Sequence, residues 1–129
     1  MNRDKQATSR LAAFRHAFSG WAYVLRTQKN AWIHAFATLM VVALGLWLGI
    51  NHQEWAIILM AIALVWMAEF LNTSLEAVVD LASPDEHPLA KAGKDVGAAA
   101  VLISALGAAI IGFLILGPPL WDRVVGLIG

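Results

Sequence analysis

The chain contains three long runs of apolar residues separated by short polar segments. A transmembrane helix needs about 20 mostly apolar residues to cross about 30 Å of hydrocarbon. The runs therefore predict membrane-spanning helices over about residues 31–50, 55–74 and 96–117. Pro118 and Pro119 follow the third run, and we expect them to end that helix because proline has no backbone N–H to donate.

Residues 9–27 show a different pattern, in which apolar side chains recur at intervals of three and four residues. This spacing predicts an amphipathic helix that lies in the membrane surface with its basic residues near anionic headgroups. A helix that packs against the protein's own bundle would show the same pattern, and the two interpretations are compatible. The apolar stripe consists of Leu11, Phe14, Phe18, Trp21 and Leu25.

Composition supports this interpretation. Of the 129 residues, 60% are hydrophobic and 14% are charged, whereas soluble domains contain about 45–50% apolar residues. We therefore predict an all-α membrane protein that forms a single domain over residues 1–129, with one surface helix and three transmembrane helices. The absence of cysteine excludes disulfide and thiolate chemistry, and we expect no nucleic-acid partner.

The charges are segregated along the chain. Residues 1–30 contain six bases and one acid, whereas residues 69–95 contain six acids and two bases. Basic residues before a first span favour a cytoplasmic N-terminus. Three crossings then place the segment 51–54 outside, the segment 80–95 inside and the C-terminus outside.

The acidic region begins inside the second span. At about 100° per residue, Glu69, Asn72, Glu76 and Asp80 fall within an arc of about 80° on one helix face. A carboxylate near the bilayer centre costs about 2.5–3.5 kcal/mol on insertion scales, which indicates that Glu69 has a partner or a task. The alternatives are that Glu69 reaches the interface, or that it pairs with Lys94 to fix helix packing.

The segment between the second and third spans adds further charged groups. Lys91, Lys94 and Asp95 are expected at the same rim of the membrane as Glu76 and Asp80. Carboxylates can hold Mg²⁺ and lysine can neutralise phosphate oxygens, and phosphoryl transfer depends mainly on positioning and charge neutralisation. The chain contains neither a Walker A motif nor a glycine-rich kinase loop.

Two motifs together resemble a known signature. "EFLNTSLEAVVD" (69–80) and "HPLAKAGKDVGAAAVL" (87–102) are similar to the motifs of the prokaryotic diacylglycerol kinase and undecaprenol kinase family, and the resemblance covers about residues 10–116. It implies a homotrimer in the bacterial inner membrane with active sites at subunit interfaces on the cytoplasmic side. It also implies direct transfer of phosphate from ATP·Mg²⁺ to undecaprenol or diacylglycerol.

The resemblance also implies roles for individual residues. Glu69 would be the general base that takes the proton from the lipid hydroxyl, and Glu76 would be a metal ligand in the ATP site. Asn72 and Asp80 would support these groups. Further ATP contacts would come from Arg10, Asp85, Glu86, His87, Lys94 and Asp95.

One residue departs from the family pattern. Gln28 stands where the family usually has a glutamate as second metal ligand, and glutamine keeps an oxygen donor but lacks the charge. One alternative is therefore that the chain is a catalytically impaired homologue of these kinases. Another is a small proton-coupled transporter in which Glu69 carries the proton.

Overall fold

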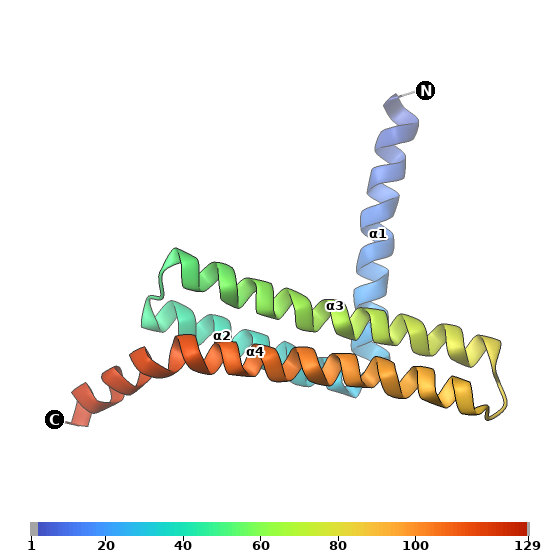
Figure 1. Cartoon of the computed structure of the whole chain (residues 1–129). Helices are drawn as coiled ribbons and strands as arrows, with labels where there is room; N and C mark the ends of the chain where they lie inside the picture. Colours follow the sequence, from blue (N-terminus) through green and yellow to red (C-terminus); the bar gives the residue numbers. More distant parts are fainter. Residues whose placement is uncertain (1–2, 129) are drawn as a thin grey trace. The chain divides into compact units, whose positions relative to one another are not determined.

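The structure, a computed structural model, describes residues 3–128. These residues form four α-helices joined by short connections (Figure 1), as the predicted all-α class requires. The helices are α1 (Arg3–Thr27), α2 (Lys29–Leu48), α3 (His52–Ala82) and α4 (Pro88–Ile128).

The chain divides into two compact units, one ending at Ile33 and the other beginning at His34. In the first unit, only Gln28 separates α1 from α2. Its backbone N–H donates to the Val24 carbonyl at 2.9 Å, and its carbonyl accepts from the Ala31 N–H at 3.3 Å. Val24 and Ala31 are fully covered, so Gln28 lies at a well-packed joint.

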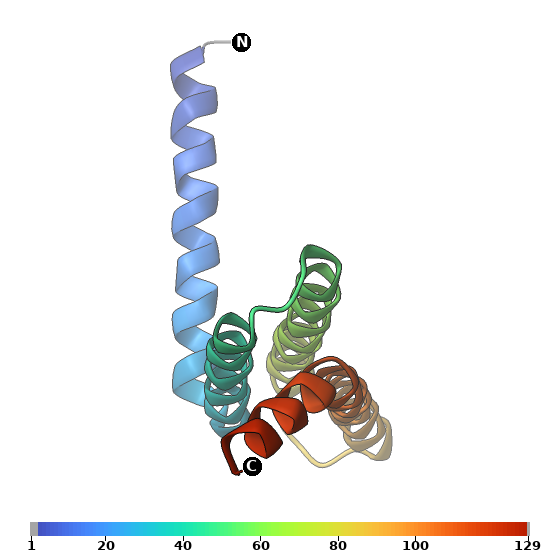
Figure 2. The ribbon, with the colours of Figure 1, turned by 90° about the vertical axis from the view of Figure 1, so that its left-hand side faces the viewer.

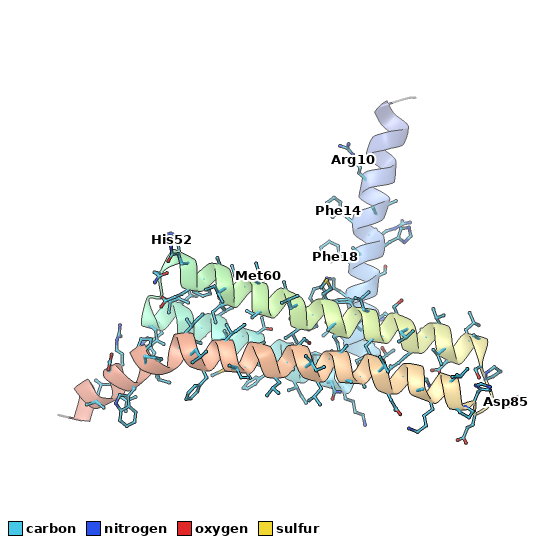
Figure 3. The ribbon with its side chains drawn as sticks, in the orientation of Figure 1. Arg10, Phe14, Phe18, His52, Met60 and Asp85 are labelled. Carbon is cyan, nitrogen blue, oxygen red and sulfur yellow. The ribbon has the colours of Figure 1, made fainter. Side chains whose placement is uncertain are left out.

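The exposed face of α1 carries aromatic side chains. Figure 3 shows Arg10, Phe14 and Phe18 on one side of this helix, as expected for residues four positions apart. Phe14 and Phe18 are about two-thirds exposed or more, at 67% and 71%, and Trp21 is partly exposed. The side chain of Leu11, the first member of the predicted stripe, lies outside the described residues. The placement of this helix in the membrane surface stays a prediction.

In the second unit, α2, α3 and α4 run side by side (Figure 1), and Figure 2 shows them nearly end-on. Each is long and apolar enough to cross a membrane. Large apolar side chains such as Leu39, Met60 and Leu106 lie on the outer surface, which suits a helix surrounded by lipid rather than water. The prediction of three apolar membrane helices is therefore confirmed.

The α3 helix begins earlier than expected, at His52 rather than Trp55. Asn51 Oδ1 accepts hydrogen bonds from the backbone N–H groups of Gln53 and Glu54, and Glu54 Oε2 accepts one from Asn51 N at 2.8 Å. This is a capping box, which satisfies N–H groups that a helix start otherwise leaves without partners. The helix therefore includes residues 52–54, which the sequence pattern predicts between the first two spans.

The α3 helix also continues to Ala82, for 31 residues in all. At about 1.5 Å per residue, it is about 46 Å long and exceeds the roughly 30 Å of hydrocarbon. We expect its acidic second half, from Glu69 onward, to reach the edge of a membrane and extend beyond it, because charged side chains are costly in hydrocarbon.

The prediction that Pro118 and Pro119 end the last helix is wrong, because α4 continues through both to Ile128. The fixed φ of proline is itself helical, so the cost lies in lost hydrogen bonds and in the clash with the preceding turn. A bend relieves that clash, and the final, red part of α4 bends away from its earlier course in Figure 1.

Close helix contacts set the register of the second unit. A Cβ added at Gly45 of α2 would lie 3.0 Å from the Trp55 ring of α3, so glycine allows the two helices to approach there. Ile58, Ala61 and Val65 of α3 are buried. The polar half of α3 runs beside the first turns of α4, where the candidate site lies.

Candidate active site

The α3 helix carries a polar stripe formed by Glu69, Asn72, Glu76 and Asp80. This stripe changes from buried to exposed along its length. Glu69 and Asn72 are 1% and 8% exposed, Glu76 is half-buried and Asp80 is exposed. Since the four side chains share one helix face, the stripe connects the interior of the helical unit to the polar end of α3. A carboxylate this deeply covered is unusual without a partner.

The partner of Glu69 is His34 of α2. Glu69 Oε2 lies 3.7 Å from His34 Nε2, and the His34 side chain is itself 14% exposed. The His34 ring meets the Trp66 ring edge-on, with 6.5 Å between centroids. Trp66 Nε1 in turn donates to Thr38 Oγ1 at 3.2 Å. These contacts join α2 to α3 around the carboxylate.

The other oxygen of Glu69 differs from the first. Oε1 is buried and has no hydrogen-bond partner among the described residues. A buried acceptor left without a donor costs free energy, and such an atom in a native structure is often at a functional site. Glu69 can therefore accept one further hydrogen bond at Oε1.

Asn72 is fixed between two helices. Its Nδ2 donates to Glu76 Oε1 at 3.0 Å, while its Oδ1 faces Gly97 of α4, where a Cβ would overlap it. Oδ1 is also buried without a hydrogen-bond partner among the described residues. The glycine thus makes room for the Asn72 amide, which in turn holds the Glu76 carboxylate.

A second cluster of charges lies where α3 connects to α4. Lys94 Nζ forms an ion pair with Asp80 Oδ1, and Lys91 Nζ pairs with Asp95 Oδ2 one turn along α4 at 2.5 Å. Asp80, Lys91 and Lys94 line a groove of about 710 Å³, whereas Asp95 is not among its lining residues. The charged and titratable side chains that line it are Asp80, Asp85, Glu86, His87, Lys91 and Lys94.

The structure brings most of the predicted site residues into the second unit. Glu69, Asn72 and Glu76 form one group. Of the predicted nucleotide contacts, the groove is lined by Asp85, Glu86, His87 and Lys94. The alternative that Lys94 pairs with Glu69 is wrong, because Lys94 contacts Asp80 and Glu69 contacts His34. Arg10 and Gln28 belong to the first unit, where Arg10 is exposed and Gln28 occupies the joint after α1.

The donor set is sparse for a metal held by protein alone. Among the side chains that the structure describes, no three of His, Asp or Glu lie close enough together to hold a metal ion. Mg²⁺ in phosphoryl-transfer sites, however, is often held by one or two carboxylates together with substrate phosphates and water. The half-buried Glu76, oriented by Asn72, fits a site of that kind.

Comparison with known proteins places the chain in a family. The family model of prokaryotic diacylglycerol kinase matches residues 15–116. The chain belongs to the prokaryotic diacylglycerol kinase family. The prediction that it is a lipid kinase and an integral membrane protein is thereby confirmed.

Individual relatives carry two different names. The diacylglycerol kinase of Synechocystis sp. is 39% identical over 96% of this chain and 71% of its own length. The undecaprenol kinase of Bacillus subtilis is 41% identical over 84% of this chain and 88% of its own length. The diacylglycerol kinase of Escherichia coli K12 is 35% identical over 68% of this chain and 78% of its own length.

Sequence reasoning about this member of the diacylglycerol kinase family missed two contacts. His34 stands within an otherwise apolar run, and an ionisable residue in a membrane span usually has a partner. The sequence therefore gave a reason to look for a partner of His34 such as Glu69. Gly97 had a weaker signal, because it is one of many small residues in α4. Only the structure shows that a side chain there would meet Asn72.

Proposed function

We propose that this chain transfers the γ-phosphoryl group of ATP, bound with Mg²⁺, to the hydroxyl of a membrane lipid alcohol. The candidate acceptors are undecaprenol and diacylglycerol, the lipids that give the relatives their names. Transfer is direct, without a phosphoenzyme, at the cytoplasmic face of the bacterial inner membrane.

The observation that carries the proposal is the environment of Glu69. It is buried on the face of an apolar helix, with one oxygen near His34 and the other without a hydrogen-bond partner in the described chain. A general base must come within about 2.6–3.2 Å of the proton that it removes. A lipid hydroxyl that donates to Oε1 would satisfy this requirement and the buried acceptor together.

The reaction then follows from the positions of these groups. Glu69 Oε1 takes the hydroxyl proton as the lipid oxygen forms a bond to the γ-phosphorus, and the bond from that phosphorus to the β–γ bridging oxygen breaks. The products are a lipid phosphate, ADP and a protonated Glu69, which returns its proton to solvent before the next turnover. Because the oxygen gains its new bond as the proton leaves, no free alkoxide has to form in the apolar region.

The groove between α3 and α4 is the proposed site for ATP. Lys94 carries a cation that can neutralise phosphate oxygens, and its pairing with the exposed Asp80 keeps it near the end of the polar stripe. Asp95 is proposed as a nucleotide contact together with Lys94. The connection between the helices contributes Asp85, Glu86 and His87, and Arg10 of the first unit is proposed as a further contact.

Glu76 and Gln28 are the proposed protein ligands of Mg²⁺. The ion would neutralise developing charge on the phosphates when it is bound. Asn72 orients the Glu76 carboxylate through its 3.0 Å hydrogen bond. The neutral Gln28 leaves the site with less negative charge than two carboxylates would supply, so we expect a high Mg²⁺ requirement.

We further propose a homotrimer with its N-terminus in the cytoplasm and its C-terminus outside. The excess of basic residues before the first span supports this orientation. The small residues of α4, which include Gly97, Gly107 and Gly112, allow close helix approach in lipid. We favour undecaprenol as the acceptor because the sequence from Asp80 to Leu102 resembles that branch.

Purified protein incubated with labelled ATP and each lipid separately tests the proposal. We expect labelled undecaprenyl phosphate, or labelled phosphatidic acid if diacylglycerol is the acceptor. Mg²⁺ should be required in either case. Failure to label either lipid, combined with proton-dependent dye efflux from cells, would instead support the transporter alternative.

A further inference from the structure

We propose that His34 is a positioning residue for the kinase reaction, which holds the Glu69 carboxylate so that Oε1 faces the lipid hydroxyl. This inference rests on the proposed role of Glu69 as the base. It assigns a task to a residue of α2, whereas the acidic stripe itself lies on α3.

The first support is the asymmetry of the Glu69 carboxylate. Oε2 faces His34 Nε2 at 3.7 Å, whereas Oε1 has no hydrogen-bond partner in the described chain. The backbone carbonyl of Glu69 accepts from Thr73 Oγ1 at 2.8 Å, which fixes the main chain but not the carboxylate. His34 is therefore the polar contact that distinguishes the two oxygens.

The second support is that His34 is itself held in place. Its ring meets the Trp66 ring edge-on, and Trp66 donates its indole N–H to Thr38 of α2. Trp66 also contacts Phe70, with 6.2 Å between ring centroids. A histidine confined in this way can orient a neighbouring carboxylate, because its own ring has little freedom to turn.

The distance has a functional meaning as well. At 3.7 Å, His34 Nε2 and Glu69 Oε2 are slightly too far apart for a hydrogen bond. Catalytic hydrogen bonds are often long without substrate and shorten when the substrate is bound. A lipid hydroxyl at Oε1 would press the carboxylate toward His34, so that Nε2 would donate to Oε2 as Oε1 takes the proton.

Substitution of His34 separates orientation from packing. In His34→Gln, the side-chain nitrogen is four bonds from Cα, as Nε2 is in histidine, so a donor to Oε2 is kept. In His34→Asn, the nitrogen is one bond closer to the backbone and cannot reach as far. We expect kcat to fall about 10- to 100-fold in His34→Leu and His34→Asn, a range typical of a misplaced reacting group, and to be largely restored in His34→Gln.

The KM for ATP provides a second readout. Because His34 acts on the base and not on the nucleotide, its variants should lower kcat and leave the KM for ATP unchanged. His52→Leu is the matched control, since His52 is an exposed histidine at the opposite end of α3 from Asp85 (Figure 3). This control should keep wild-type kcat.

A double-mutant cycle with Glu69→Gln tests whether the two residues act as one unit. If His34 works only through Glu69, the double variant His34→Leu/Glu69→Gln should be no slower than Glu69→Gln alone. Losses that multiply in the double variant would overturn the inference. Equal kcat in His34→Leu and the wild type would overturn it too.

Three outcomes keep the test decisive. If His34→Leu unfolds at lower temperature, the comparison of His34→Gln with His34→Asn decides, and equal kcat in those two variants would overturn the inference. Full activity in Glu69→Gln would instead overturn the proposed base, and the role of His34 with it. An inactive Glu69→Gln beside a fully active His34→Asn would overturn the role of His34 alone.

Discussion

The two ends of the polar stripe on α3 differ in whether their polar side chains have partners. At Glu69 and Asn72, the side chains are buried and each has an oxygen without a hydrogen-bond partner in the described chain. At Asp80, the side chain is exposed and forms an ion pair with Lys94. An unsatisfied buried acceptor is costly, whereas an exposed ion pair contributes little. We therefore place the proposed reaction at the buried end and the proposed reversible binding of the nucleotide at the exposed end.

The largest effect is expected at the buried end. Glu69→Gln keeps the size of the side chain and one side-chain oxygen, but it removes the carboxylate that can take a proton. We expect lipid phosphorylation to fall about 10²- to 10⁴-fold, the usual contribution of general base catalysis. Glu54→Gln is the matched control, because glutamine can also occupy this place in a capping box. Similar rates in the two variants would remove the assignment of Glu69.

The next effect is expected where the buried end meets α4. Gly97→Ala would place a Cβ onto Asn72 Oδ1 and displace the amide that holds Glu76. We expect activity to fall about 10- to 100-fold and the free energy of unfolding to decrease by about 1–3 kcal/mol, as overpacking usually costs. Gly126→Ala, near the end of the same helix, where a Cβ also meets nothing within 4 Å, should change both quantities little. An active and stable Gly97→Ala variant would contradict the packing that we describe.

A smaller effect, of opposite sign, is expected in the first unit. Gln28→Glu adds a carboxylate, which hard cations prefer as a ligand, so the Mg²⁺ concentration for half-maximal activity should decrease several-fold. Gln53→Glu, at an exposed position in the first turn of α3, is the control. An unchanged Mg²⁺ requirement in Gln28→Glu would show that residue 28 is not a metal ligand.

The smallest effect is expected at the exposed end. Asp80→Asn removes the partner of Lys94, and we expect at most a few-fold change in the KM for ATP. Because salt screens exposed charges, the difference from the wild type should shrink as ionic strength is raised in the assay. Asp122→Asn, an exposed substitution in the last part of α4, controls for net charge. A loss of activity as large as that of Glu69→Gln would contradict the distinction between the two ends.

Much of this arrangement could be predicted from the sequence, because helix periodicity fixes which residues share a face. The stripe from Glu69 to Asp80 and the three apolar helices follow from that rule. The contacts between helices do not follow from it, since they depend on register. The pairing of Glu69 with His34 and the close approach of Asn72 to Gly97 are of this kind.

The errors at helix ends have a local cause. The start of α3 at His52 depends on a capping box at Asn51 and Glu54, a signal that the apolar pattern alone does not include. The continuation of α4 through Pro118 and Pro119 shows that two prolines can bend a helix without ending it.

The account depends on the polar end of α3 facing the compartment that supplies ATP. Since the chain has no cysteine, single cysteines can be introduced at His52 and at the 75%-exposed Leu89, near opposite ends of α3. A membrane-impermeant thiol reagent should label His52→Cys in intact cells and label Leu89→Cys only after the membrane is opened. Labelling of Leu89→Cys from outside intact cells would place the proposed nucleotide groove away from ATP and contradict the kinase site.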